Sequence, residues 1–258
     1  MLIRVPYSLS KLMPHKLPGK LLRLFPLQCA ICELESETGI GICKICNAQL
    51  PWIESACYQC GLPVAERLLL GGRCGRCIMK CPEFDSCQAL FHYRPPLDRL
   101  IIQHKFQRRL DIGASLGWLL GERLHHCSLA QAARGKPELL LPVPLHRARM
   151  NRRGFNQAWE LTRAASKASG IPSCNGMIER IRDTTPQTEL ADATARRKNL
   201  KAAFAARDPE AAGNVSSVTI IDDVVTTAST VNAMAACLKQ QGIRRVDVYC
   251  VARANIRL

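Results

Sequence analysis

Four Cys-x-x-Cys pairs in succession constrain this chain more than any other feature of its sequence. A two-residue spacing lets both sulfurs of a tight turn face one tetrahedral metal ion, and two such turns complete a shell of four thiolates. Gaps of ten, ten and thirteen residues separate the pairs, so neighbouring pairs can share an ion. Four pairs therefore predict two structural zinc ions. The predicted ligands are Cys29, Cys32, Cys43 and Cys46 for one ion and Cys57, Cys60, Cys74 and Cys77 for the other.

Two alternatives to this assignment stay open. A crossed arrangement would join the first pair with the third and the second with the fourth, and four thiolates also suit an iron–sulfur cluster. Gly61 and Gly75, which follow Cys60 and Cys74, favour the turns of a zinc ribbon. Because small metal-bound segments owe their folding to the ion, we expect chelation to unfold residues 29–81 and to leave the C-terminal domain folded.

The cysteines also indicate the domain organisation and the compartment. Ten of the fourteen lie between residues 29 and 87, which marks a separate N-terminal module. Residues 1–28 are interrupted by prolines and basic residues, unlike an export signal, and no run of about 18 apolar residues predicts a transmembrane segment. Reduced thiols in a cytoplasmic protein follow. The predicted parts are a basic leader (1–28), a double zinc ribbon (29–81) and a further domain (86–258).

The last third of the chain alternates between strand and helix patterns. Residues 218–221 and 246–251 are apolar, strand-like runs, and residues 229–241 between them have helical spacing. A strand, a helix and a strand within about 35 residues form a βαβ unit, which implies a parallel sheet.

The basic leader, residues 1–28, is interpreted as packing on the first zinc site, with a membrane-surface or partner-binding tail as the alternative.

Two adjacent carboxylates and a hydroxyl-rich loop follow the strand at 218–221 and lead directly into the predicted helix. Backbone N–H groups at a helix N-terminus favour an anion, and hydroxyls can add donors to a phosphate. The carboxylates, expected to be partly exposed and unpaired, can accept hydrogen bonds from a ribose diol or assist Mg²⁺. A helix cap, the alternative, explains only one carboxylate. The predicted ligand residues are Asp222, Asp223, Thr226, Thr227, Ala228, Ser229 and Thr230.

This segment resembles the phosphoribosyl diphosphate signature of type I phosphoribosyltransferases, which usually have glycine where this chain has Ala228. With three further segments the chain resembles the ComF (competence protein F, GntX-like) family over about residues 29–255. The resemblance implies an α/β fold, in which a small double zinc ribbon precedes a type I phosphoribosyltransferase-like parallel sheet flanked by helices. The three segments are Pro142-Val143-Pro144-Leu145, Arg152-Arg153-Gly154-Phe155-Asn156-Gln157, and the run with Gln187, Leu190, Arg196, Arg197, Asn199, Leu200 and Phe204.

The resemblance also implies ligands and partners. These are phosphoribosyl diphosphate with Mg²⁺, single-stranded DNA, and DNA-uptake or helicase proteins, in a role in competence or in the use of extracellular DNA. An active phosphoribosyltransferase would displace diphosphate from C1 of the ribose with a nitrogen nucleophile. A binding module would hold the ligand as a signal without turnover. No general base or acceptor pocket is recognisable, so no catalytic residue is assigned.

Basic residues dominate the middle of a chain whose net charge is +15. Guanidinium forks suit diphosphate oxygens and the phosphates of a nucleic acid, so a diphosphate site or a polyanion surface is predicted, with a solvated basic face as the alternative. Binding to single-stranded DNA should then weaken steeply with salt. The residues concerned are Arg147, Arg149, Arg152 and Arg153, joined for DNA by Arg196, Arg197 and Lys198.

Overall fold

The computed structural model describes residues 28–130, 136–182, 203–207 and 215–254. The chain divides into two compact units, one up to Gln49 and the other from Leu50 onward. The first unit contains the turns around two cysteine pairs and the short helix α2 (Lys44–Ala48). The predicted ribbon module, 29–81, is thus not one compact unit by itself, and its independent folding stays a prediction.

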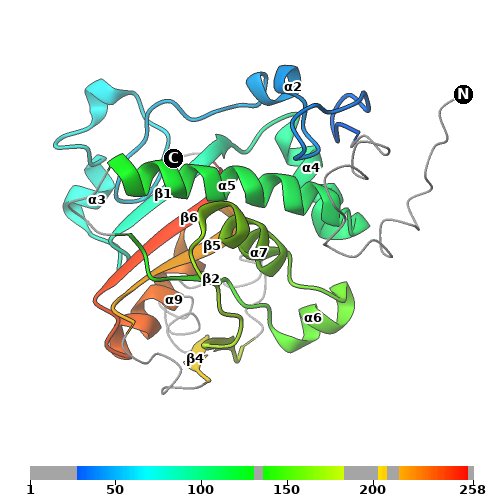
Figure 1. The fold of residues 1–258 in the computed structure, drawn as a ribbon. Coiled ribbons are helices and arrows are strands. Elements are labelled where there is room, and N and C mark those ends of the chain that lie inside the picture. The colour runs from blue at the N-terminus through cyan, green and yellow to red at the C-terminus, as the bar shows by residue number, and fades with distance from the viewer. Residues whose placement is uncertain (1–27, 131–135, 183–202, 208–214, 255–258) are drawn as a thin grey trace, which may run out of the picture. The chain divides into compact units, whose positions relative to one another are not determined.

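A four-stranded parallel sheet forms the centre of the second unit (Figure 1). Its order is β1-β6-β5-β2. Nearly every residue of the two central strands is buried, as in parallel strands that are covered on both faces. The predicted parallel sheet is confirmed. The strands are β1 (Ser86–His92), β2 (Leu139–Pro142), β5 (Ser217–Val225) and β6 (Arg245–Arg253).

Helices cover this sheet on both faces (Figure 1). Helices α5 (Leu110–Ala130) and α7 (Gln157–Ser169) lie side by side over one face, and α9 (Ser229–Gln240) packs on the other. Gly117 and Gly121 let α5 approach the backbone of α7, because a Cβ at either position would come within about 2.6 Å of a carbonyl oxygen of α7. Helix α4 (Leu97–Gln107) precedes α5.

The outer edge of β1 is covered by the preceding chain. Ile53 N donates to Leu90 O at 2.9 Å and His92 N to Pro51 O at 2.8 Å, so residues 51–53 run along the strand. Covering an edge in this way removes a template for pairing with other chains. Residues 51–53, which lead to Cys57 and the last two cysteine pairs, therefore cover this edge of the sheet.

Short elements complete the described chain, and one sequence prediction needs correction. Strand β5 continues to Val225, four residues past the predicted end, since Asp222, Val224 and Val225 pair with β6. Pairing with a central strand overrides the low strand propensity of Asp. The sequence also gave no indication that Arg147–Arg153 would form a helix. The short elements are η2 (Glu66–Leu68), α3 (Gly75–Met79), α6 (Arg147–Arg153) and the antiparallel pair β3 (Ile178–Arg180) and β4 (Phe204–Ala206).

Candidate functional site

The eight paired cysteines form two groups of four. Within each group the four sulfur atoms lie within 4.8 Å of one another. The grouping is sequential: the first two pairs form one group and the last two the other, so the crossed arrangement is not adopted. We call them the first group (Cys29, Cys32, Cys43 and Cys46) and the second group (Cys57, Cys60, Cys74 and Cys77).

Backbone N–H groups around the sulfurs fit bound thiolates. Although burial opposes ionisation, hydrogen bonds from the backbone of Cys32, Cys43 and Ile31 lower the pKa of Cys29 to about 6. Hydrogen bonds from Cys74, Cys60 and Gln59 likewise lower the pKa of Cys57 against the effect of burial.

Cys60 and Cys46, by contrast, have pKa values raised by their surroundings. Burial and the neighbouring Cys57 and Cys74 raise the pKa of Cys60 to about 12. Burial and the sulfurs around it raise the pKa of Cys46 as well. A divalent ion removes this repulsion, so two structural zinc ions fit the two groups.

The second group is built into the unit that holds the sheet. Gln59, inside the first turn of this group, donates from Nε2 to Phe84 O at 2.9 Å and to Asp85 O at 3.2 Å, just before β1. Cys87 N, in β1, donates to Tyr58 O at 3.0 Å. A Cβ on Gly61 would lie 2.9 Å from Cys87 Sγ. This turn therefore packs directly against the first strand.

The paired carboxylates lie where β5 ends. Asp222 Oδ1 accepts from Asp223 N at 2.9 Å, and Asp223 Oδ1 accepts from Val224 N at 2.7 Å. Burial, with the adjacent Asp223 carboxylate as the second cause, raises the pKa of Asp222 to about 8, against the opposing effect of Lys105. Asp222 is thus largely protonated at neutral pH in the free protein.

Lys105, near the end of α4, pairs with the second carboxylate. Its Nζ lies 2.7 Å from Asp223 Oδ2, and the Asp223 residue is only 3% exposed. The expectation that both carboxylates would be partly exposed and unpaired is therefore wrong for Asp223. The Lys105 ammonium therefore occupies the position beside the Asp223 carboxylate that a metal ion would take. Mg²⁺ bound with a ligand would have to displace Lys105 or bind the carboxylate together with it.

The loop between β5 and α9 carries hydroxyl groups on the surface. Thr226 and Thr227 are exposed, and Thr227 Oγ1 lies 2.8 Å from Ser229 Oγ. Ala228 has a φ of 63°, a left-handed conformation that a side chain disfavours, and α9 begins at the next residue. The loop thus turns sharply into the N-terminus of a twelve-residue helix, whose first N–H group, that of Ser229, donates to Thr227 Oγ1 at 3.4 Å.

Arg253, the last residue of β6, binds backbone carbonyls at the start of this loop. Its side chain is buried, and Nη1 donates to Val225 O at 2.9 Å and to Thr226 O. On its other side, Nε donates to Cys60 O at 3.1 Å. One guanidinium thus joins the loop to a turn of the second group.

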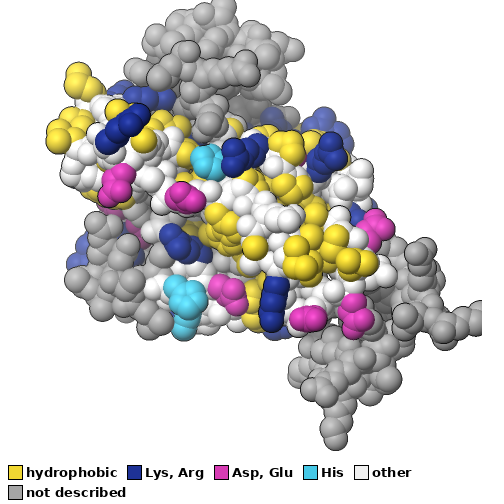
Figure 2. All heavy atoms as spheres, turned by 90° about the horizontal axis from the view of Figure 1, so that it is seen from above, with side chains coloured by type: hydrophobic (Ala, Val, Ile, Leu, Met, Phe, Trp, Pro, Cys, Tyr) yellow, Lys and Arg dark blue, Asp and Glu magenta, His cyan; other side chains and the backbone are white. Residues whose placement is uncertain are grey.

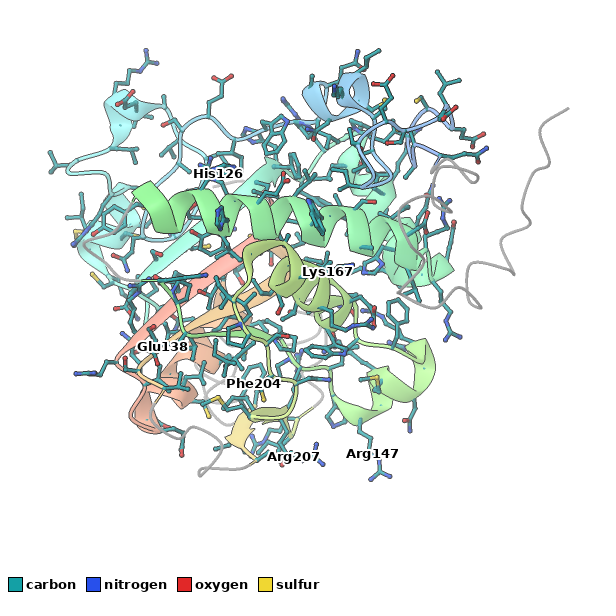
Figure 3. All side chains as sticks on the ribbon, in the orientation of Figure 1. His126, Glu138, Arg147, Lys167, Phe204 and Arg207 are labelled. Atoms are coloured by element: carbon teal, nitrogen blue, oxygen red, sulfur yellow. The ribbon has the colours of Figure 1, made fainter. Side chains whose placement is uncertain are left out.

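The predicted arginines belong to α6 and its C-terminal end. Arg147 is exposed and points outward from α6 (Figure 3). Arg153 lies with its Cζ 5.3 Å from the centre of the Phe106 ring, whose residue is 67% exposed. Burial lowers the pKa of Arg153, Asp223 opposes this, and Arg149 and Arg152 reinforce it. Arg153 is therefore close enough to interact with Asp223, Arg149 and Arg152.

Basic residues elsewhere are dispersed. On the face drawn in Figure 2, the described Lys and Arg side chains alternate with acidic and apolar ones and form no continuous basic surface. Arg196, Arg197 and Lys198, with the predicted run from Gln187 to Leu200, lie outside the described residues. Within the described chain no helix combines the length and apolarity needed to cross a membrane.

Sequence reasoning missed Lys105, Gln59 and Arg253. Nothing in the sequence marks Lys105, which sits on a helix far from the loop in the chain. Arg253 did give a signal, since it directly follows the apolar run 248–252, and charged side chains are seldom buried without partners.

Two comparisons with known proteins concern the architecture. Residues 21–78 match the double zinc ribbon domain, which with the sheet and its helices confirms the predicted fold class. A glutamine phosphoribosylpyrophosphate amidotransferase from B. subtilis, solved with ADP and GMP, is similar with a TM-score of 0.36 and 17% identity, over 58% of this chain and 30% of that chain.

Two relatives align over nearly their whole length. DNA utilization protein YhgH of Salmonella typhimurium is 36% identical over 231 residues, which cover 88% of this chain and 97% of that protein. Competence protein F of Haemophilus influenzae is 33% identical over 241 residues, or 91% and 100% of the two chains. The chain therefore belongs to the ComF family, with competence protein F and the DNA utilization proteins YhgH.

Proposed function

We propose that this protein binds phosphoribosyl diphosphate with Mg²⁺ at the end of β5, binds single-stranded DNA through the arginines of α6, and acts in the cytoplasm in DNA uptake or the use of extracellular DNA. One observation carries the ligand proposal: two adjacent carboxylates lie in the last four residues of a buried strand, and a hydroxyl-rich loop leads from this strand into the N-terminus of α9. The names of the relatives, competence protein F and DNA utilization protein YhgH, support the cellular role.

The arrangement offers a different group to each part of the ligand. The loop amides and the hydroxyls of Thr227 and Ser229 suit the 5-phosphate. The carboxylates of Asp222 and Asp223 suit the ribose diol or the metal ion. Arg153 interacts electrostatically with Asp223 and with Arg149 and Arg152, and these arginines suit the diphosphate.

Titration of Asp222→Asn with phosphoribosyl diphosphate and Mg²⁺ tests the diol site. The amide oxygen accepts more weakly than a carboxylate, and a charge-assisted hydrogen bond contributes roughly 1.5–3 kcal/mol, so affinity should fall about tenfold or more. Asp222 is the better single change, because Asp223→Asn would also leave Lys105 without its carboxylate. The double variant Asp222→Asn, Asp223→Asn should bind most weakly.

Glu138→Gln is the matched control. Glu138 bonds to Ser216 at the opposite end of the sheet, so this change removes a carboxylate without touching the loop. Its affinity should equal that of the unaltered protein. Equal affinity in the Asp222→Asn variant, with the protein folded, would show that these carboxylates are not the diol site.

Proton release gives a second test of the same site. Because the pKa of Asp222 is raised to about 8, its carboxyl is protonated at pH 7, whereas hydroxyl donors or Mg²⁺ favour the carboxylate. Binding should therefore release close to one proton at pH 7, and affinity should rise with pH until about pH 8 and then level off. Calorimetry in buffers of different ionisation enthalpy measures the release, which Asp222→Asn should abolish.

The DNA-binding part of the proposal is tested by salt dependence. Each phosphate contact adds about 0.7 to the slope of log affinity against log salt for a single strand. Arg149→Gln and Arg152→Gln should each reduce that slope by about this amount. An unchanged slope in both variants would exclude α6 from the DNA surface.

An active phosphoribosyltransferase is the second candidate, favoured by the arginines beside Asp223. In a transfer reaction these cations would neutralise the departing diphosphate. Diphosphate release in the presence of bases or nucleotides would identify turnover, whereas a binding module releases none.

A further inference from the structure

We propose that Arg253 couples the second four-cysteine group to the phosphate loop, so that metal bound by this group maintains the loop in its ligand-binding conformation. The identity of the ligand rests on the function proposed above. The coupling itself rests on four contacts of one side chain and is testable without the ligand.

Arg253 is 2% exposed, and its guanidinium is surrounded by backbone carbonyl oxygens. Nη1 donates to Val225 O at 2.9 Å, to Thr226 O, and more weakly to Ala254 O at 3.4 Å. Nε donates to Cys60 O at 3.1 Å. The acceptors therefore come from three segments: the end of β5, the chain after β6, and a turn of the second group.

A buried cation makes this arrangement hard to deform. The desolvation of a charge costs several kcal/mol unless hydrogen bonds compensate it, and a guanidinium has five N–H donors in a fixed plane. If either the loop or the cysteine turn moves away, the charge stays buried and loses acceptors. The loop and the turn are therefore held at a fixed distance as long as both keep their shapes.

The shape of the turn depends on the metal. Cys60 contributes its sulfur to the second group and its carbonyl to Arg253. The turn is closed by two backbone bonds, Gly61 N to Cys57 O at 2.8 Å and Cys57 N to Leu62 O at 3.0 Å, and its two sulfurs lie within 4.8 Å of the other two sulfurs of the group, where one ion would hold all four. Loss of the ion frees both sulfurs of this turn, and the Cys60 carbonyl loses its fixed position.

The hydroxyl face of the loop lies at the surface. Thr226 and Thr227 are exposed, and Ala228 holds an unfavourable left-handed conformation. Arg253 donates to the backbone carbonyls of Val225 and Thr226, at the start of the loop. Release of its hold on Val225 and Thr226 should therefore let the loop relax, which lowers the affinity for a phosphate.

Hydrogen exchange of the amides of residues 225–230 tests the coupling without the ligand. Cys74→Ala removes a ligand of the second group, and Cys43→Ala makes the matched change in the first. Both residues precede a five-residue helix, α3 and α2. We expect faster exchange in the loop for Cys74→Ala and for Arg253→Met, little change for Cys43→Ala, and an intermediate rate for Arg253→Lys.

Reciprocal binding distinguishes coupling from simple loss of folding. Coupling between two sites is mutual and commonly amounts to 5- to 150-fold. In Cys43→Ala, which keeps only the second metal site, saturating phosphoribosyl diphosphate should slow the release of zinc to a chelator about tenfold. Adding Arg253→Met to this variant should remove the effect, and the ligand should not slow release of the ion kept by Cys74→Ala.

The outcomes separate the two proposals. If loop exchange responds to Cys74→Ala and Arg253→Met but no variant binds phosphoribosyl diphosphate, the coupling holds and the proposed ligand is wrong. If the ligand binds yet slows zinc release equally with and without Arg253, the coupling is wrong. Unchanged loop exchange in folded Arg253→Met also overturns it.

Discussion

Cys29 and Cys57 begin two turns of the same shape. In the first group, Glu33 N donates to Cys29 O at 2.9 Å and Cys29 N to Leu34 O at 2.7 Å. In the second, Gly61 N donates to Cys57 O at 2.8 Å and Cys57 N to Leu62 O at 3.0 Å. The fifth residue of each turn is left-handed, with φ of 63° and 67°.

What surrounds the turns differs. The second turn contacts β1 through Gln59, Tyr58 and Gly61, and reaches the phosphate loop through Arg253. The first turn belongs to the other compact unit. Identical metal-binding patterns can thus serve as a separate small unit or as part of a larger one, and only the contacts outside the pattern tell them apart.

The largest expected difference is the effect of losing one metal ligand. Four hydrogen bonds link the second turn to the rest of the compact unit that holds the sheet, called here the sheet unit: two from Gln59, one from Cys87 and one from Arg253. At about 1 kcal/mol each, their loss lowers the free energy of unfolding by about 4 kcal/mol. Cys74→Ala should therefore lower the Tm of the sheet unit by about 10 °C.

Cys43→Ala is the control, because it should reduce bound zinc by one ion per chain and leave that Tm within about 2 °C. Calorimetry and metal analysis measure both quantities. From the sequence, we expect chelation to unfold residues 29–81 alone. The contacts of the second group add that removal of its ion should also destabilise the sheet. Equal Tm values for the two variants would mean that the second group is as separate as the first.

A smaller difference is expected at the fifth residue of the second turn. Alanine at Gly61 must adopt a left-handed φ, at about 1–2 kcal/mol, and its Cβ would meet Cys87 Sγ at 2.9 Å. Gly61→Ala should thus lower the free energy of unfolding of the sheet unit by about 2 kcal/mol or more, measured by urea denaturation. Gly39→Ala has the same left-handed strain and no neighbour within 4 Å, so it should leave the sheet unit unaffected. A neutral Gly61→Ala would contradict the close packing on β1.

The sequence predicted these features unequally, for physical reasons. The cysteine spacing predicted both groups because tetrahedral coordination by tight turns depends on local geometry, and the strand–helix–strand pattern predicted the parallel sheet. The pairing of Lys105 with Asp223, the bonds of Gln59 and the burial of Arg253 depend on segments more than 20 residues apart, so no local pattern indicates them. The carboxylates were predicted to follow the strand, but pairing with β6 extends β5 past them, and their surroundings depend on α4 and β6.

The smallest effect should appear at Glu33, the fifth residue of the first turn, where only the left-handed backbone conformation is at issue. Glu33 is exposed and holds a φ of 63°, and glycine adopts this conformation without the cost of a Cβ. The gain is partly offset because glycine increases the entropy of the unfolded chain, so Glu33→Gly should stabilise the first unit by about 0.5–1 kcal/mol. With the first zinc ion as the reporter, in the Cys74→Ala background, this stabilisation should make a chelator compete about two- to fivefold less effectively. Glu37→Gly removes another exposed carboxylate at a position without a left-handed φ, and it should weaken zinc retention slightly through the same entropy term. If Glu33→Gly weakens retention as Glu37→Gly does, the first turn is not strained in solution, and the glycine of the second turn is required by its contact with β1 alone.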